Sequence, residues 1–386
     1  MSDYKKYYSQ FLKKHEGQLH LSSHSHYFWP DISFEAYQDY WDLAAGKSDQ
    51  KWEQIFTQDI PKAQSIISKI LNIDNPQRIA FAPNTQELTA RLISCFYEKD
   101  QMKFLTTRSE FHSFSRQISR LEEESHVQVD YIDNEEEAFE KDFLESISSD
   151  LTMIFLSQVF YNSGKLISKE FIKKIIAKKS KETVLVIDGY HGFCAVETDL
   201  SDVIEEIYYL SGAYKYAQAG EGMCFMTTPM NCKLRPLNTG WFAAFSDLEN
   251  KSNDVSYDNS GLRFASSTLD FSTLFKFNKI WSEFEKDNIS YTDIIKHSKD
   301  LQKVFFNEVD QSYLTSRELD KIGLFLCYDF KDISVAQDIF EALKQNNILT
   351  DRRDARIRFS FAAYITQEEV EKASKLFNGL ITKFCK

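Results

Sequence analysis

Glycine is scarce in this chain of 386 residues, which contains only 12. That is about 3% of the sequence, against a usual share of roughly 7%. Seven of the 12 lie in one stretch, from Gly164 to Gly240. Because glycine is used where the backbone needs a positive φ or where a ligand comes close, this clustering predicts a functional site in that stretch.

Long apolar runs and excess positive charge are also missing. No run reaches the length of a membrane-spanning helix, and the first residues, MSDYKKYYSQFLKKHEG, lack the apolar segment of a secretory signal, so we expect neither. The chain has 46 Lys and Arg against 58 Asp and Glu, a net charge of -12. Since phosphate contacts need clustered Lys and Arg, this argues against nucleic acid or an anionic membrane as a partner.

The six cysteines form no CxxC pair, which argues against a zinc site and favours a reducing compartment. We therefore expect a cytoplasmic protein without a metal. The only further metal motif is the HxH of His24 and His26, which has no carboxylate partner nearby in the sequence.

Apolar strands alternate with helical patterns over most of the chain. After a short amphipathic helix at the N-terminus, the pattern predicts strands over 78–82, 102–107, 126–132, 151–157, 183–188, 206–211 and 222–228. Such alternation is typical of an α/β fold with a mainly parallel sheet covered on both faces. Ligands in these sheets bind beyond the carboxyl ends of the strands, so the residues that follow each strand are the ones to inspect.

The pattern changes after about residue 265. A long helical region is followed by strands over 321–330 and 355–361 and by helices over 333–346 and 366–384, which predicts a smaller α+β domain. A polar segment near 246–260 is the expected connection. We predict a large domain over 20–265 and a small domain made of 1–19 and 266–386.

Two charged residues follow strands in the glycine-rich stretch. Asp188 ends the strand of TVLVIDGYHGF, with His191 three residues later, and Lys215 lies 27 residues after Asp188 among small residues. The aspartate could cap a helix or form a salt bridge, and the lysine could be a solvated surface charge. Alternatively, the carboxylate holds a protonated ring nitrogen and a desolvated lysine forms a Schiff base.

A third motif is the helix start in IAFAPNTQELTARL. Asn84, Thr85 and Glu87 follow a strand and form an Asn/Glu capping pattern. This is either an ordinary helix cap or a phosphate site, where free backbone N–H groups and the helix dipole attract an anion.

The order of these motifs resembles that of pyridoxal 5′-phosphate (PLP) enzymes of fold type I. DGYH followed by SGAYKY is similar to the class V aminotransferase group, and within it to the kynureninase-like branch, over about residues 19–380. The resemblance implies the aspartate-aminotransferase-like fold, with a seven-stranded, mainly parallel sheet in the large domain. It also implies a homodimer with shared active sites.

The resemblance assigns residues on the cofactor side. It implies that Lys215 forms the Schiff base, Asp188 bonds the pyridine nitrogen and His191 lies near the phenolic oxygen of the ring. Further cofactor contacts implied are Asn84, Thr85 and Tyr214 at the phosphate, Ser157 near the ring, and Trp241 and Thr268 across the dimer interface. Phe111 is the implied stacking residue, although it could belong to the core, and His112 is the alternative stacker.

It also assigns residues on the substrate side. In DRRDARIRFSFAAYIT, Arg358 is implied to pair with the α-carboxylate of an amino-acid substrate, while the neighbouring arginines are expected to be solvated. LHLSSHSHYFWP occupies the place of a turn that lines the substrate pocket, which makes His24, Ser25 and His26 candidate substrate contacts.

The implied activity is that of a PLP enzyme acting on an α-amino acid, either kynureninase-like Cβ–Cγ hydrolysis or transamination. Phe114 stands where kynureninases have an acidic residue, which weakens the prediction of kynureninase-like hydrolysis. A cysteine desulfurase-type lyase is an alternative, but that branch needs a nucleophilic cysteine, and the only cysteine between residues 233 and 384 is Cys327, inside an apolar strand. A non-catalytic PLP-fold binding module is the last alternative.

Overall fold

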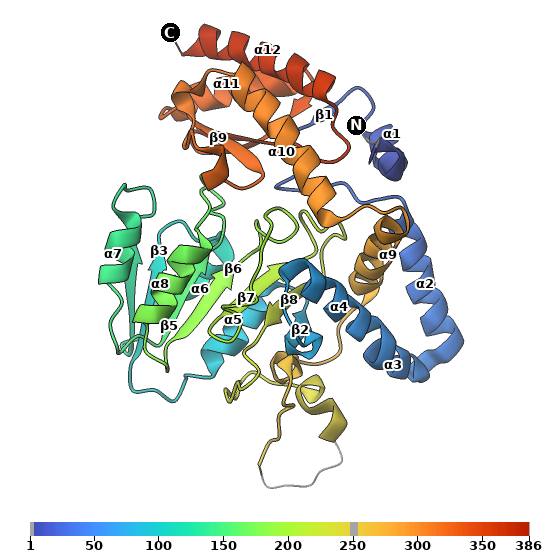
Figure 1. Ribbon diagram of the computed structural model, residues 1–386, viewed down its shortest axis with the longest axis vertical. Coiled ribbons are helices and arrows are strands. Elements are labelled where there is room, and N and C mark those ends of the chain that lie inside the picture. Colours follow the sequence, from blue (N-terminus) through green and yellow to red (C-terminus); the bar gives the residue numbers. More distant parts are fainter. Residues whose placement is uncertain (1–3, 248–253, 386) are drawn as a thin grey trace.

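A computed structural model describes residues 4–247 and 254–385. The fold is built on one sheet of seven strands in the order β2-β8-β7-β6-β5-β3-β4 (Figure 1). Their bounds are Ile79–Ala82, Met102–Thr107, Val127–Ile132, Met153–Ser157, Val184–Asp188, Tyr208–Gly212 and Cys224–Thr227 for β2 to β8. Every strand runs parallel to the others except β8, which is antiparallel to both its neighbours. The predicted seven-stranded, mainly parallel sheet is thus confirmed.

The strands alternate between two apolar cores. In β6, Leu185 and Ile187 join one core cluster, while Val184 and Val186 join the other. This period of two places successive side chains on opposite faces of the sheet, and strands buried on both faces need apolar residues at every position.

Helices cover both faces of the sheet, as Figure 1 shows. Those connecting the parallel strands are α5 (Thr85–Ser94), α6 (His112–Glu122), α7 (Phe139–Glu145) and α8 (Lys169–Lys178). Helices α2 (Ile32–Lys47), α3 (Lys51–Gln54), α4 (Ile60–Leu71) and α9 (Ser272–Lys286) lie together beside strands β2 and β8. The sequence patterns had not singled out the helices between residues 32 and 71.

A second, smaller sheet lies above the carboxyl ends of the parallel strands (Figure 1). It is antiparallel, in the order β11 (Asp351–Arg353), β12 (Arg356–Ser360), β9 (Phe325–Asp329). Helices α10 (Tyr291–Glu308), α11 (Ile333–Gln345) and α12 (Gln367–Phe384) pack with it. This agrees with the α+β pattern predicted after residue 265.

The N-terminal segment reaches this smaller sheet. The predicted first helix is a 3-10 turn, Tyr4–Tyr8, followed by α1, Ser9–Lys14. Strand β1 (Leu19–His20) then pairs in parallel with β10 (Ile348–Leu349), and Ser22 bridges to Ser360 of β12. The division into 20–265 and 1–19 with 266–386 stays a prediction.

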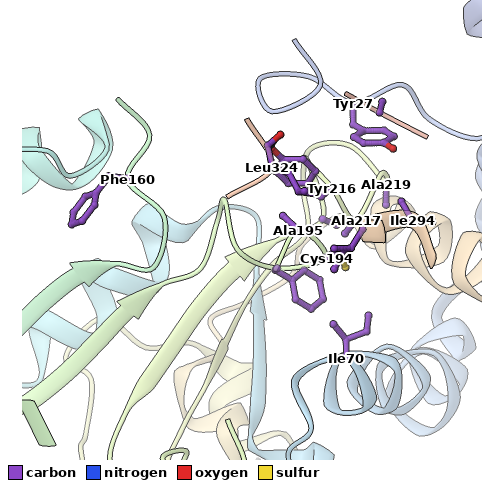
Figure 2. Close-up of a cluster of buried hydrophobic side chains, with 14 of the residues drawn as sticks. Tyr27, Ile70, Phe160, Cys194, Ala195, Tyr216, Ala217, Ala219, Ile294 and Leu324 are labelled. Carbon is purple, nitrogen blue, oxygen red and sulfur yellow. Dashed lines mark hydrogen bonds between the residues drawn. The ribbon is translucent and has the colours of Figure 1, made fainter. Parts of the chain in front are cut away.

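The segment after Lys215 packs into the core. Figure 2 shows Tyr216, Ala217 and Ala219 in a cluster of buried side chains that also contains Tyr27 and Leu324. The hydroxyl of Tyr216 donates to the Leu324 carbonyl at 3.5 Å. These three buried residues therefore hold the loop that carries Lys215 against the rest of the protein.

Part of the predicted connection over 246–260 lies outside the described residues, because these exclude 248–253. Within the described parts of the chain, no helix has the length and apolar character needed to cross a bilayer.

Candidate active site

One cavity of about 560 Å³ opens at the carboxyl ends of β5 and β6, where Ser157 and Asp188 end their strands. It brings together ten of the residues predicted from the sequence: Ser25, Asn84, Thr85, Phe111, Ser157, Asp188, His191, Tyr214, Lys215 and Arg358. These come from seven separate segments of the chain, so the folding of both sheets is needed to form the cavity.

Asp188 is buried at the end of β6. Its Oδ1 accepts a hydrogen bond of 2.8 Å from the Tyr190 backbone N–H, and the carboxylate forms no ion pair within the described residues. Burial raises its pKa from 3.8 to about 6, although the Tyr190 N–H and the Lys215 charge oppose that shift. A buried carboxylate without a cation is costly, so a cationic group on a ligand would stabilise it.

Lys215 lies in the loop between β7 and β8. Its Nζ donates to the backbone carbonyl of His24 at 2.6 Å. Burial first, and then the charge of Arg358, lower the pKa of Lys215 from 10.5 to about 7. The lowered pKa favours the neutral amine, which is the nucleophilic form.

His191 is buried beside the same cavity. Its Nδ1 has no hydrogen-bond partner among the described residues. Burial, reinforced by the Lys215 charge, lowers the pKa of His191 well below 6.5. The ring is therefore neutral, with a buried polar atom that a ligand could satisfy.

Helix α5 begins at the cavity. The Asn84 side chain caps it by accepting from the Glu87 N–H at 2.9 Å, and Asn84 has an extended backbone with φ of -153°. Asn84 and Thr85 both line the cavity. The predicted cap is thus present, and its position places the positive end of the helix dipole where an anion could bind.

The two candidate stackers are placed differently. Phe111 lines the cavity, is 44% exposed and meets Tyr161 edge-on with ring centroids 5.6 Å apart. His112 starts helix α6 and is not among the described residues that line this cavity. An exposed aromatic ring beside a cavity does not belong to the core, which favours Phe111 as a stacking residue.

Ser157 has a buried acidic neighbour that the sequence reasoning missed. Its Oγ donates to Glu110 at 2.5 Å, and the Thr107 hydroxyl donates to the same carboxyl group at 2.8 Å. Burial raises the pKa of Glu110 to about 8. This acid holds the end of β5 to the end of β3, just beneath the cavity.

Arg358 is buried and paired within the protein. Its Nη2 donates to Asp351, its cross-strand partner on β11, and its Nη1 donates to the Tyr161 carbonyl. His24 lies behind this pair, with Nε2 3.5 Å from Asp351 and Nδ1 2.8 Å from the Ser360 hydroxyl. His24 therefore supports the arginine without lining the cavity.

Three other predicted residues lie outside the cavity of this chain. The His26 ring is 5.7 Å from the ring of Tyr214, which does line it. Trp241 packs against Phe245 at 5.4 Å, and Thr268 is exposed. The predicted roles of Trp241 and Thr268 at a partner subunit stay predictions.

Sequence reasoning missed several cavity residues. They are Gln86, Ser113, Val159, Tyr161, Tyr190 and Arg353. Tyr190 is inside the DGYH motif and could have been inferred from it. Arg353 was expected to be solvated, and it is 47% exposed while it also lines the cavity. Arg356, also expected to be solvated, pairs with Glu135 at 2.5 Å.

Two of the clustered glycines, Gly189 and Gly192, allow close packing within the protein. A Cβ on Gly189 would lie 2.0 Å from the Tyr209 ring, and one on Gly192 would lie 1.8 Å from Gln158 Oε1. Glycine therefore lets the Asp188–His191 turn lie directly on the sheet. The cluster correctly marked the site, but at these two positions for a different physical reason.

The residues present fit PLP. Among the residues that the structure describes, one cavity is surrounded by a buried carboxylate that forms no ion pair, a lysine with a lowered pKa, a histidine nitrogen without a hydrogen-bond partner and a helix start. The carboxylate suits the protonated ring nitrogen of PLP, and the lysine suits its aldehyde. The histidine nitrogen suits the phenolic oxygen, and the helix start suits the phosphate.

Solved structures share this fold. A C-DES variant with glycine covalently linked to its PLP cofactor has a TM-score of 0.82 at 12% identity, covering 98% of this chain and 99% of that one. The cystine C-S lyase C-DES, in complex with its reaction product cysteine persulfide, has a TM-score of 0.81 at 13% identity, with coverage of 95% and 99%. The apo cysteine desulfurase from Thermococcus onnurineus NA1 has 0.78 at 16%, covering 99% of each.

No curated protein sequence matches the chain. The comparisons give no support for the kynureninase-like branch. The family Aminotransferase class-V, however, matches over residues 31–373, which is most of the chain. The chain therefore belongs to the class V aminotransferase family of PLP-dependent enzymes.

Proposed function

We propose that this protein is a PLP-dependent lyase that cleaves the Cβ–S bond of a sulfur-containing α-amino acid without using a cysteine of its own. This reaction corresponds to the lyase alternative more closely than to kynurenine hydrolysis or transamination. The observation that carries it is the composition of the cavity, which has a poised lysine and a buried arginine but no cysteine among its described lining residues.

The cysteines support this choice against a desulfurase that stores sulfur on the enzyme. Cys327 is buried in β9, its Sγ donates to the Asn162 carbonyl at 3.2 Å, and burial raises its pKa to about 12. The thiolate is the nucleophile in such chemistry, and this thiol stays protonated at neutral pH. The fold likeness to the C-S lyase C-DES is consistent with a lyase.

The residues divide the work of binding and proton transfer. Asp188 would hold the cofactor's ring nitrogen, the start of α5 its phosphate and Lys215 its aldehyde carbon. When bound, PLP supplies an electron sink for the electron pair left on Cα. Arg358 would hold the substrate carboxylate and so orient the Cα–H bond toward Lys215.

The bond changes balance without a further reactant except water. Lys215, as a neutral amine, accepts the α-proton, and the Cβ–S bond breaks with its electrons leaving on sulfur. The remaining three-carbon enamine takes up water to give pyruvate and ammonia. The sulfur leaves as a thiol or, from a disulfide such as cystine, as a persulfide.

Product analysis tests this proposal. The PLP-loaded protein is incubated with cystine, cysteine, kynurenine, or alanine plus a keto acid. We expect pyruvate and ammonia from a sulfur amino acid, and the same yield from a Cys327→Ser variant. Alanine plus anthranilate from kynurenine would contradict it, and so would transfer of the alanine amino group to the keto acid, which gives pyruvate and a new amino acid without free ammonia. Alanine formed from cysteine and lost in Cys327→Ser would show a desulfurase.

A non-catalytic binding role is the second candidate from a different class. It would require PLP to bind while no member of the amino-acid panel is converted. Arg358 argues against this role, because it lines the same cavity as Lys215 and a module that only binds PLP does not need a group that can hold a substrate carboxylate.

A further inference from the structure

Arg358 already has a carboxylate partner when no substrate is present. Asp351 lies opposite it on the neighbouring strand, and its Oδ2 accepts from Arg358 Nη2. Both side chains are nearly buried, with exposures of 3% for Arg358 and 11% for Asp351. This ion pair occupies part of the guanidinium that a substrate carboxylate would need.

We propose that Asp351 is a built-in competitor of the substrate α-carboxylate, which must displace it from Arg358. This inference rests on the proposed function, because it takes Arg358 as the carboxylate-binding residue. It assigns to Asp351 the role of setting how tightly the site binds carboxylates. Asp351 has this effect by acting on Arg358, and it does not touch the reacting atoms.

The surroundings allow this exchange. Arg353 Nε lies 3.6 Å from Asp351 Oδ1, and His24 Nε2 lies 3.5 Å from Asp351 Oδ2. A displaced Asp351 would keep Arg353, which lines the cavity and is 47% exposed, as its counter-ion. The displaced carboxylate is therefore not left as an unpaired buried charge, which would be costly.

Arg358 is in turn prepared to accept a second carboxylate. Its Nε is buried without a hydrogen-bond partner among the described residues, while Nη1 is fixed by the Tyr161 carbonyl. A carboxylate that replaces Asp351 could therefore satisfy a donor that the protein leaves unused.

The test measures carboxylate binding directly. Propionate, which has no amine and cannot react, is titrated into the PLP-loaded protein by calorimetry, with the cofactor absorption followed in parallel. Asp351→Asn keeps an acceptor opposite Arg358 but removes the competing charge, so we expect propionate to bind about tenfold tighter or more. Asp354→Asn is the matched control, because Asp354 lies in the same hairpin with φ of 49°, which asparagine tolerates. We expect the Asp354→Asn variant to bind propionate as tightly as the wild type does.

Two further variants separate the possible failures. Asp351→Ser, which removes the charge with a shorter polar side chain, should shift binding in the same direction if Asp351→Asn does not fold. Arg358→Ala should abolish propionate binding. If Arg358→Ala binds like the wild type, the carboxylate site of the proposed function is wrong. If Arg358→Ala loses binding while the Asp351 variants bind equally or more weakly than the wild type, the competitor role alone is overturned.

Discussion

The two sides of the cavity are built in different ways. On the cofactor side, Asp188 and Ser157 end neighbouring strands of one sheet, and Lys215 follows the next strand in line. On the substrate side, Arg358 depends on Asp351, on the carbonyl of Tyr161 and on the His24 turn behind them. One side comes from adjacent strand ends, and the other from segments more than 100 residues apart.

The charges on the two sides differ as well. Asp188 forms no ion pair within the described residues, whereas Arg358 is neutralised by Asp351. The cofactor side thus leaves uncompensated groups that a ligand can satisfy, while the substrate side satisfies itself until a ligand displaces one partner. We infer that the cofactor binds firmly and the substrate reversibly.

The largest effect should follow from Lys215→Ala. It removes both the covalent link to the cofactor and the proposed base, so we expect turnover to fall by about three orders of magnitude or more. Turnover and the cofactor absorption band measure this. The control is Lys276→Arg, because Lys276 is another lysine whose pKa is lowered, to about 8, and it is buried away from the cavity. Equal losses of turnover in both variants would contradict the special role of Lys215.

Arg358→Lys should have a smaller effect, confined to the substrate side. A lysine keeps the charge but loses the planar fork, so we expect KM for the amino acid to rise by about ten- to a hundredfold with a smaller change in kcat. Steady-state kinetics and PLP titration check this. A loss of PLP affinity in place of the KM increase would show that the two sides are not independent.

The pH dependence of cofactor loading should show the lowered pKa of Lys215. Only the neutral amine attacks an aldehyde, and its fraction rises through a midpoint near pH 7. Loading of the ligand-free protein should therefore be roughly tenfold faster at pH 8 than at pH 6, for a single group. Stopped-flow absorbance measures it, with Nα-acetyl-lysine as the unshifted control. A loading rate that keeps rising toward pH 10 would show that the pKa of Lys215 is not lowered.

The smallest expected effect concerns the free energy of unfolding. Gly189→Ala would place a methyl group 2.0 Å from the Tyr209 ring, and we expect a loss of about 1–3 kcal/mol. Gly379→Ala, in helix α12 with open space around it, should gain up to about 1 kcal/mol. Urea unfolding of the two variants compares them. Equal stabilities would mean that the Asp188 turn is not packed as described.

The sequence predicted the cofactor side well, because its residues lie in short motifs next to strands. Asp188, Lys215 and the Asn84 cap could each be found from an apolar strand and the residues that follow it. Asp351 and Glu110 could not be found in this way. Each is an acidic residue whose partner is fixed by pairing in the folded sheets, Arg358 across a hairpin in one case and Ser157 on another strand in the other.

The fold, too, was predicted best where a short local pattern was enough to identify an element. Strands rich in apolar residues were recognised, and their bounds agree closely with the structure, as for 102–107 and β3. Helix α2 was missed because its apolar residues are not confined to one buried face: Phe34, Tyr37 and Trp41 are exposed on its surface. The kynureninase-like assignment failed to gain support because it relied on motifs that hold the cofactor, which say little about the substrate.

The central claim is that Lys215 is the residue that holds PLP in this cavity. Borohydride reduction of the PLP-loaded protein, followed by peptide mass mapping, tests it most directly. The account predicts one pyridoxyl group per chain, on the peptide that contains Lys215, and none on that peptide in Lys215→Ala. A pyridoxyl group on Lys276, or on no lysine at all, would contradict it.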